Sequence, residues 1–323
     1  MTDLSTAVAT QMAHTLDQTD FPELGERYEG KVRDVYRQPE RMVVVTTDRV
    51  SAFDRVLGTV PFKGEILTGI ARSEFNATQD VVPNHVLSHP DPNVLVAKPC
   101  RPYPVEFVVR AYITGSLWRD YASGAAKAYE IDLPPRLRKD ERLLGPILTP
   151  STKAARGDHD EPISKRAIVQ NGLMTSAQLE AAEAAALALF ARGVERAETK
   201  GLILVDTKYE LGEDADGELT VIDEIHTPDS SRYWRAETYR ERFLAQRPQV
   251  MLDKENLRQW LLQEHGFRGQ GEPPPLSEEI RTTLALRYAE LHEALIGQTF
   301  APEVGPAAER VHRNLVAAGL LSK

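Results

Sequence analysis

The chain has 323 residues, of which 41% are hydrophobic and 27% charged, so it is long enough to bury a full hydrophobic core. Its formal net charge of −9 excludes the broad basic surface that drives non-specific nucleic-acid binding, although local basic clusters can still hold small phosphates. The single cysteine, Cys100, excludes an internal disulfide, and no stretch has the apolar character of a signal peptide or membrane span, so we expect a cytoplasmic protein.

The N-terminal part has the composition of a β-rich region. Residues 1 to about 20 form a polar lead-in that is compatible with a helix or with a loose segment. Tyr28 to Tyr36 and Arg41 to Thr47 then predict two strands, and Val105 to Ile113 predicts a third, because each is rich in β-branched and aromatic residues. We therefore expect an α+β fold with an N-terminal antiparallel β lobe over residues 1–115 and a C-terminal α+β lobe over residues 116–323.

Two polar stretches of the N-terminal part are candidates for phosphate contacts. In the predicted strand around Gly30, alternation places Lys31 and Arg33 on one face, and the glycine lets a ligand approach the backbone. The chain has neither a Walker A loop nor a GxGxxG fingerprint, so this pattern alone does not establish nucleotide binding. The run Thr47 to Asp54, which includes Ser51, is as typical of a turn as of a ligand contact.

Arg110 interrupts the apolar stretch from Phe107 to Ile113, and a buried guanidinium needs an anion. Gly115 and Ser116 then open a predicted helix whose free N–H groups favour the same anion. An internal salt bridge is the alternative explanation for Arg110.

The middle of the chain alternates between loop and helix signals. Leu133 to Glu161 is rich in proline and glycine, and a loop of this length is more often functional than idle. Thr175 and Gln178 form a capping box, which predicts a helix that continues to Gly201. A second amphipathic helix is expected near the C-terminus, where the apolar face consists of Ile280, Leu284, Tyr288, Leu291 and Leu295.

An acidic hairpin is predicted after residue 201. On its first strand, Asp206, Lys208 and Glu210 share one face. If Asp216 and Gly217 form a two-residue turn, Glu210 lies directly opposite Asp223 on the second strand, whereas Glu224 lies on the other face. Like charges in this position need a positive charge between them, and Mg²⁺ binds one or two carboxylates together with substrate phosphates. The alternative is an exposed hairpin whose charges face solvent.

The segment after the hairpin, HTPDSSRYW, offers hydroxyls, the Asp229 carboxylate and the Arg232 guanidinium. Arg232 is suited to bidentate phosphate recognition, or alternatively packs its stem on Tyr233 or Trp234.

The order of these segments carries more information than any one of them. GKVRDVY, TDRVSAFD, VEFVVRAYITGSLW, TPSTKAARGDHDEPIS, ILVDTKYELG and DEIHTPDSSRYW closely resemble the phosphoribosylaminoimidazole-succinocarboxamide synthase (SAICAR synthetase) family over about residues 25 to 260. The resemblance implies ATP-dependent ligation of L-aspartate to carboxyaminoimidazole ribotide (CAIR) in purine synthesis, through an acyl phosphate. It also implies a kinase-like N-terminal lobe, with ATP and Mg²⁺ bound between the lobes. The chain looks like the longer type of this family.

The resemblance also assigns roles to individual residues. It implies nucleotide phosphate contacts for Lys31 and Arg33, and Mg²⁺ binding for Glu210, Asp223 and Asp160. It implies substrate binding for Ser51, Arg110, Ser116 and Arg232, and catalytic roles for Lys153, Lys208 and Asp229. The expected partners are CAIR, L-aspartate and ATP, with no nucleic acid and no membrane, and the expected state is a monomer or small homo-oligomer. A small-molecule kinase and a non-catalytic nucleotide-binding protein are the rival functions.

Overall fold

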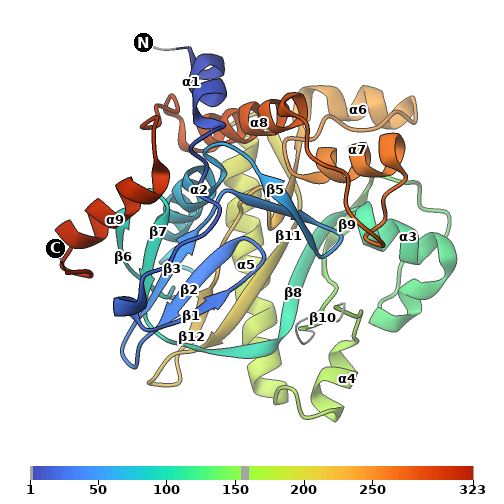
Figure 1. The fold of residues 1–323 in the computed structure, drawn as a ribbon. Coiled ribbons are helices and arrows are strands. Elements are labelled where there is room, and N and C mark those ends of the chain that lie inside the picture. The colour runs from blue at the N-terminus through green and yellow to red at the C-terminus, as the bar shows by residue number, and fades with distance from the viewer. Residues whose placement is uncertain (1–2, 154–159, 323) are drawn as a thin grey trace.

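The computed structural model describes residues 3–153 and 160–322 (Figure 1). Two antiparallel sheets dominate the described part of the chain. The first sheet has the order β1-β2-β3-β7-β6 and consists of β1 (Glu26–Glu29), β2 (Arg33–Arg37), β3 (Met42–Thr46), β7 (Val94–Ala97) and β6 (Val86–Asp91). The second sheet has the order β10-β8-β11-β12 and consists of β10 (Ser151–Thr152), β8 (Arg101–Ile113), β11 (Leu202–Glu213) and β12 (Leu219–Ile222). The predicted α+β fold with antiparallel sheets is confirmed.

Additional strands and helices surround these sheets. In the second sheet, β9 (Glu141–Leu148) pairs with β8, and β13 (Ser231–Arg235) pairs with β11, while β4 (Arg49–Ala52) and β5 (Arg55–Thr59) form a separate hairpin. The helices are α1 (Leu4–Gln11), α2 (Lys63–Thr78), α3 (Gly115–Ser123), α4 (Lys165–Gln170), α5 (Ser176–Glu198), α6 (Ala236–Leu244), α7 (Glu255–His265), α8 (Glu278–Ile296) and α9 (Ala307–Ala317). Short 3-10 turns occupy Pro22–Leu24 and Ala125–Tyr129. Over the residues that the structure describes, none of these helices combines the length and apolarity that a membrane crossing needs.

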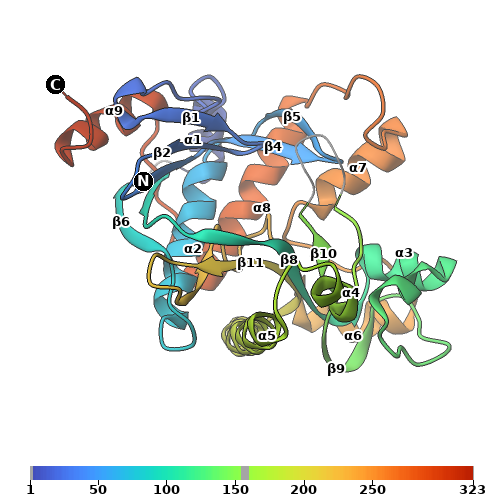
Figure 2. The ribbon, with the colours of Figure 1, turned by 90° about the horizontal axis from the view of Figure 1, so that it is seen from below.

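Helix α5 lies on one face of the second sheet, as Figure 2 shows, and begins at the predicted capping box. Thr175 and Gln178 exchange their side-chain hydrogen bonds with each other's backbone N–H groups. In the middle of β8, the odd-numbered residues Val105, Phe107 and Val109 are buried in the same core cluster as this helix. The even-numbered residues therefore face the other side of the sheet, because side chains alternate along a strand.

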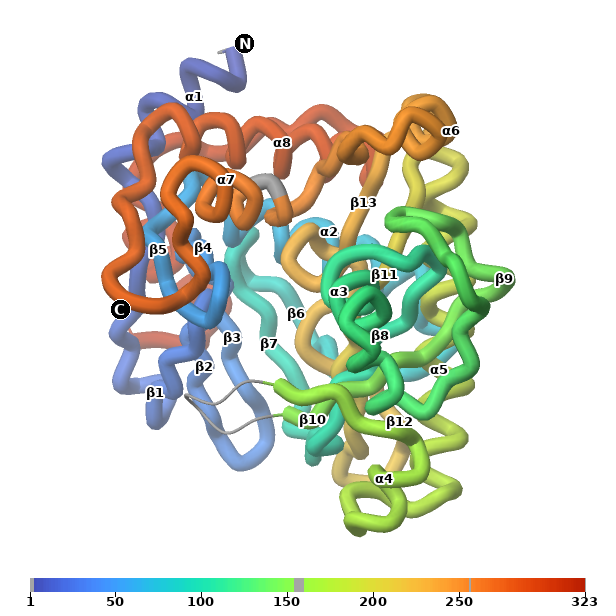
Figure 3. Tube along the Cα trace, turned by 90° about the vertical axis from the view of Figure 1, so that its right-hand side faces the viewer, coloured from blue at the N-terminus to red at the C-terminus, as the bar shows by residue number. Residues whose placement is uncertain are grey.

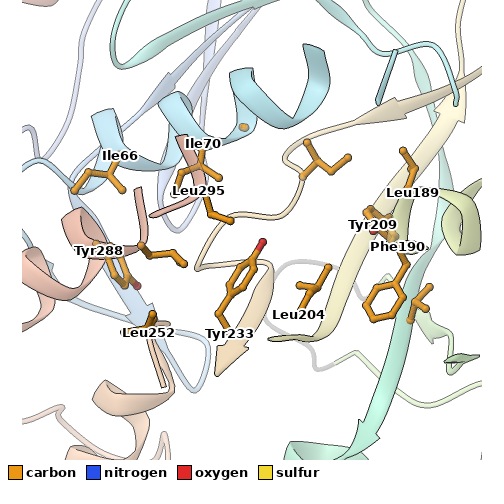
Figure 4. Close-up of a cluster of buried hydrophobic side chains, with 14 of the residues drawn as sticks. Ile66, Ile70, Leu189, Phe190, Leu204, Tyr209, Tyr233, Leu252, Tyr288 and Leu295 are labelled. Carbon is orange, nitrogen blue, oxygen red and sulfur yellow. The ribbon is translucent and has the colours of Figure 1, made fainter. Parts of the chain in front are cut away.

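The main hydrophobic core joins α2, α5, α8 and the second sheet. Figure 4 shows part of it, with Ile66 and Ile70 of α2, Leu189 and Phe190 of α5, and Tyr209 of β11. Burial of each large apolar side chain of this kind contributes about 2 kcal/mol, so the contacts of α5 and α2 hold the back of the second sheet firmly. A rigid sheet of this kind is a suitable support for charged side chains on its open face.

The structure corrects two predicted elements. Tyr28 to Tyr36 is not one strand, because Gly30 to Val32 form the turn between β1 and β2, in which Gly30 N–H donates to Arg33 O at 2.8 Å. Lys31 and Arg33 therefore do not share a strand face. The predicted loop from Leu133 to Glu161 contains β9 and β10, although residues 154–159 lie outside the described residues.

The predicted boundary at residue 115 stays a prediction, and two features of the fold bear on it. Strand β8 precedes residue 115 but pairs with β11, so it belongs to the second sheet. Helix α9, near the end of the chain, packs its Val311 and Leu315 against Val43 and Val45 of β3. A division by sheets would thus place β8 in the second lobe and α9 in the first.

Candidate active site

A cleft of about 1630 Å³ opens between the two sheets. Figure 3 shows the surrounding elements, with β2 and β3 on one side, β8 and β11 on the other, and α7 and α3 at the ends. All of the predicted site residues line this cleft: Lys31, Arg33, Ser51, Arg110, Ser116, Lys153, Asp160, Lys208, Glu210, Asp223, Asp229 and Arg232. The cleft thus brings together side chains that are up to 201 positions apart in the sequence, from Lys31 to Arg232.

The floor of the cleft is the open face of β8 and β11. Asp206, Lys208 and Glu210 share this face, as predicted. The carboxylate directly across from Glu210 is Glu106 of β8, which the sequence analysis missed. Lys208 Nζ lies 2.6 Å from Glu106 Oε1 and 3.2 Å from Glu210 Oε1, and Lys153 also contacts Glu210. Burial favours a raised pKa for Glu210, but Lys208 and Lys153 outweigh it and lower the pKa to about 2.

The predicted register of the acidic hairpin is wrong by one residue. Glu210 pairs with Ile222, because Asp214 pairs with Glu218 beyond the two strands and leaves a loop of three residues, Ala215 to Gly217. Gly217 has a φ of +80°. Asp223 therefore lies beyond β12, where its φ of +68° turns the chain into the cleft. The correction removes the predicted cross-strand pair but still leaves Asp223 at the site.

Arg33 holds the two acidic residues that follow β12. Its Nη1 lies 2.6 Å from Asp223 Oδ1 and its Nη2 lies 2.9 Å from Glu224 Oε2. The expectation that Glu224 faces away is therefore wrong. Burial raises the pKa of Asp223 to about 6, and the negative charges of Glu210 and Glu224 add to this effect while Arg33 opposes it. Glu210 and Asp223 thus lie close enough for the negative charge of Glu210 to raise the pKa of Asp223.

The acidic residues suit one mode of metal binding and not another. Among the described residues, no group of three or more His, Cys, Asp or Glu side chains could hold a metal by itself. Two carboxylates combined with ligand phosphates are a common arrangement for Mg²⁺, which rarely uses a cage made of protein alone. Glu210 and Asp223 fit the arrangement of two carboxylates with ligand phosphates. Burial raises the pKa of the Glu106 carboxyl, and the nearby negative charge of Asp160 adds to this shift.

The opposite end of the cleft holds a cluster of arginines. Arg110 donates from Nε to Thr149 Oγ1 at 2.7 Å and from Nη2 to Ser116 Oγ at 3.0 Å. Its Nη1 lies 3.2 Å from Asp206 Oδ2, which Arg232 also contacts. The predicted alternative, an internal salt bridge, is therefore present. Burial lowers the pKa of Arg110, and the positive charge of nearby Arg232 lowers it further. Asp206 opposes this shift, but its carboxylate is shared by the two guanidiniums.

By direct contact, the arginine cluster has more positive than negative groups, and the Asp120 carboxylate acts on Arg110 from a greater distance. Glu255 of α7 lies 3.7 Å from Arg232 and 3.2 Å from Arg258. Within the described part of the chain, these contacts join the guanidiniums of Arg110, Arg232 and Arg258 to the carboxylates of Asp206 and Glu255. The Asp253 carboxyl interacts electrostatically with Arg232, but burial raises its pKa to about 7, so it carries only part of a charge at neutral pH. A bound anion would balance the remaining positive charge of the cluster.

Asp229 is deeply buried and surrounded by protein groups. Its carboxylate lies 2.8 Å from Lys63 Nζ and 3.0 Å from Tyr288 Oη, and Lys254 Nζ is 3.8 Å away. Burial favours a raised pKa for Asp229, yet Lys254 and Lys63 outweigh it and hold the pKa well below its usual range. Asp229 therefore serves as the counterion of two lysines.

Lys31 and Ser51 lie at the mouth of the cleft. The Lys31 side chain is 54% exposed and contacts Asp54, which is at the tip of the β4–β5 hairpin. Ser51 is buried on β4 but lines the cleft. Lys31 and Ser51 thus border the cleft, and the carboxylate that Lys31 contacts is that of Asp54.

Several residues at the site were missed by the sequence analysis, namely Lys63, Glu106, Lys254 and Arg258. Glu106 could have been found, because it lies four residues before Arg110 and so shares its strand face. Lys254 and Arg258 are four residues apart at the start of α7, a spacing that places them on one side of the helix. Lys63 gives no such signal, since its partner Asp229 is 166 residues away.

Comparisons with known proteins agree with the sequence resemblance. Residues 26–274 match the sequence model of a family described as SAICAR synthetase. A phosphoribosylaminoimidazole-succinocarboxamide synthase of Legionella pneumophila (strain Lens) is 44% identical over 310 residues, which cover 94% of this chain and 98% of that protein. The protein of the same name from Bacteroides thetaiotaomicron is 46% identical over 308 residues, which cover 93% and 98% of the two chains.

A solved structure gives the same result. A SAICAR-synthase from Saccharomyces cerevisiae, in complex with SAICAR, matches 89% of this chain and 100% of its own, with a TM-score of 0.77 and 27% identity. Nothing in these comparisons supports the rival small-molecule kinase. The chain therefore belongs to the SAICAR synthetase family of ATP-dependent ligases.

Proposed function

We propose that this cleft joins L-aspartate to CAIR in two steps, with ATP as the activating substrate. A carboxylate is a poor electrophile because its leaving group would be an oxide, so the CAIR carboxylate first takes the γ-phosphoryl group of ATP. The aspartate amine then attacks the acyl phosphate, a C–N bond forms, a C–O bond breaks, and phosphate leaves. The observation that carries the proposal is that one cleft presents a carboxylate pair at one end and surplus arginines at the other.

The nucleotide is proposed to lie against the first sheet. Lys31 and Arg33 face the cleft where ATP phosphates would lie, and Arg33 already connects this region to Asp223. Beyond Arg33, the lining becomes apolar, with Val35, Met42 and Val44, which suits a purine base.

Glu210 and Asp223 are proposed to hold Mg²⁺, with Asp160 as a further ligand. The metal would neutralise phosphate charge during transfer. The contact between Lys153 and Glu210 would then open, which leaves Lys153 free to turn to the substrates. Lys208, fixed between Glu106 and Glu210, would stabilise negative charge on the group in transfer.

Arg110, Ser116 and Arg232 are proposed to bind the ribotide phosphate, and Ser51 to contact substrate from the mouth of the cleft. Guanidinium groups recognise phosphate oxygens through paired hydrogen bonds, and the start of α3 adds backbone N–H groups that no N-cap side chain satisfies. The surplus of positive charge described above supports this assignment.

The aspartate is proposed to bind near α7, where Lys254 and Arg258 offer positive charges to its two carboxylates. Asp229 would act through Lys254, whose position it fixes, and not by direct contact with aspartate. No protein nucleophile takes part, since catalysis relies on positioning and charge neutralisation.

Omitting one reactant at a time tests this function. Purified enzyme with Mg-ATP, CAIR and aspartate should form ADP and SAICAR, and SAICAR formation should stop when any reactant is left out. Glu210→Gln should cut turnover without unfolding the protein, because it removes charge from the metal site. Wild-type turnover by this variant at saturating Mg²⁺ would contradict the metal assignment. A cytoplasmic location and a monomer or small homo-oligomer remain proposals that rest on sequence.

A further inference from the structure

Behind the floor of the cleft lies a buried chain of hydrogen bonds. Tyr209 lies between Lys208 and Glu210 on β11 but points in the opposite direction, into the core (Figure 4). Its Oη is 2.6 Å from His226 Nε2, and His226 Nδ1 is 2.9 Å from Glu74 Oε2. Glu74, in turn, accepts from Arg196 Nη2 at 2.9 Å. Tyr209 and His226 are fully buried and Glu74 is 1% exposed, so these groups depend on one another for hydrogen bonds.

Charge fixes the direction of two of these hydrogen bonds. Burial favours a raised pKa for Glu74, but His226 and Arg196 outweigh it and lower the pKa, so this carboxylate only accepts hydrogen bonds. His226 Nδ1–H and the Arg196 guanidinium therefore both donate to Glu74. The Tyr209 hydroxyl completes the connection through His226 Nε2.

His226 also belongs to the segment that carries Asp223 and Asp229. Asp223 and His226 both have left-handed backbone conformations, with φ values of +68° and +55°, which are uncommon for residues other than glycine. Such conformations persist only where the surroundings fix them. The His226 ring is enclosed, because a Cβ at Gly193 of α5 would lie 2.5 Å from its Cε1, and its carbonyl accepts from Tyr233 Oη at 2.8 Å.

We infer that Tyr209, His226 and Glu74 are positioning residues for the ligation. Their hydrogen bonds tie the segment that carries Asp223 to the strand that carries Glu210, and so set how the two carboxylates meet the magnesium–nucleotide complex. The inference rests on the proposed assignment of Glu210 and Asp223 to that complex. None of the three side chains lines the cleft, so they would act through the residues that do.

Tyr209→Phe tests the inference, because it removes one hydroxyl and keeps the ring. Calorimetric titration with ADP should give an affinity about tenfold weaker than wild type when Mg²⁺ is present, since outer partners of metal ligands typically have effects of this size. Titration with ADP in the presence of EDTA should match wild type. In steady-state assays, kcat should fall while the KM for CAIR stays unchanged.

Tyr36→Phe is the matched control. Tyr36 is also fully buried, and its hydroxyl bonds Thr19 Oγ1 at 2.9 Å and Phe21 N at 3.1 Å, but it lies in the separate core of the first sheet. Both variants should melt at lower temperature than wild type, and only Tyr209→Phe should lose magnesium-dependent affinity. His226→Gln, which shortens the connection, should behave like Tyr209→Phe.

The outcomes separate this inference from the proposed function. If Tyr209→Phe and His226→Gln both bind Mg-ADP as Tyr36→Phe does, the positioning role is wrong, while a loss of affinity in Glu210→Gln would still support the metal site. If Glu210→Gln itself binds Mg-ADP as wild type does, the metal assignment is wrong and the positioning role falls with it.

Discussion

Two charge clusters in the described part of the chain are built around arginine side chains, and their charge balance is opposite. In the cleft, Arg110, Arg232 and Arg258 share Asp206 and Glu255. Under α9, Arg310 lies 3.1 Å from Glu65 and 3.2 Å from Asp91, and it also contacts the Asn93 amide oxygen. The first cluster has too few carboxylates for its guanidiniums, and the second has more than its one guanidinium needs.

The difference shows how to distinguish a binding cluster from a structural one. Burying a charge is costly unless a partner balances it, so a structural cluster is expected to be complete within the protein. The Arg310 guanidinium satisfies this expectation, because Glu65 of α2 and Asp91 at the end of β6 both contact it within the protein. A cluster with surplus positive charge is instead preorganised for an anion that arrives later. Four substitutions test whether the two clusters differ in this way.

The largest effect is expected for Arg232→Ala. Loss of this guanidinium should lower kcat/KM for CAIR about a thousandfold, or about 4 kcal/mol, because the proposed contact with the ribotide phosphate would be lost. The melting temperature should change little, since Asp206 keeps Arg110 as its partner. Kinetics with varied CAIR and varied ATP check this prediction, and an effect confined to ATP would contradict the phosphate assignment.

Arg310→Met should lower stability and leave activity unchanged, which is the reverse of the effect expected for Arg232→Ala. It leaves Asp91, whose side chain is fully buried, without its guanidinium, and should lower the free energy of unfolding by about 3 kcal/mol. Below the new melting temperature, kcat/KM should equal that of wild type. Arg313→Met on the same helix is the control, because its pair with Glu303 is largely exposed and should contribute less than about 1 kcal/mol. Denaturant titrations of the three proteins would decide.

Asp206→Asn increases the surplus of positive charge in the cleft. The variant should lose about 2 kcal/mol of stability, because Arg110 and Arg232 no longer share a carboxylate. Inorganic phosphate should then raise its melting temperature more than it raises that of wild type, since the anion replaces the missing charge. Equal phosphate shifts in both proteins would argue against an anion site here.

The smallest effect is expected for Glu65→Gln, and it depends on pH. Burial raises the pKa of Glu65 from 4.5 to about 7 in the folded state, with Asp48 and Asp91 adding to this shift and Arg310 opposing it. The folded protein therefore binds a proton more readily than the unfolded chain, so this group lowers stability above pH 7 and stops doing so as pH falls toward 4.5. Glu65→Gln should gain about 1 kcal/mol at pH 8 and little at pH 5.

Unfolding measurements across this pH range test the Glu65 prediction. Glu309→Gln on α9 is the control, because its side chain is exposed and its effect should not vary with pH. A gain that is the same at pH 5 and pH 8 would show that Glu65 is not the titrating group.

Local patterns predicted the parts of the site that depend on a single strand or helix. Alternation along β11 placed Asp206, Lys208 and Glu210 on one face, and the capping box at Thr175 placed the start of α5. Such patterns succeed because they depend only on neighbouring residues. That the predicted site residues all line one cleft could not follow from such patterns, and it was implied instead by the family resemblance that the ordered motifs carry.

Features that depend on distant pairing were not predictable in the same way. The Asp216-Gly217 signal fits two-residue and three-residue loops, and the choice between them moved Asp223 off the strand. Glu106 shares a face with Arg110, but its importance comes from Lys208, which is 102 residues away. The turn at Lys31 was taken for a strand because Gly30 and Val32 are compatible with both.

The position of α9 has a consequence for how the protein is made. The core of the first sheet is completed by Ala307, Val311, Leu315 and Leu321, although the strands that they cover are synthesised early. A growing chain on the ribosome therefore carries the apolar face of β3 and β7 uncovered until α9 emerges. Chaperones that recognise exposed apolar strands would have a binding site throughout that interval, and a nonsense mutation before residue 307 would leave that site permanently open to the proteases that remove unfinished proteins.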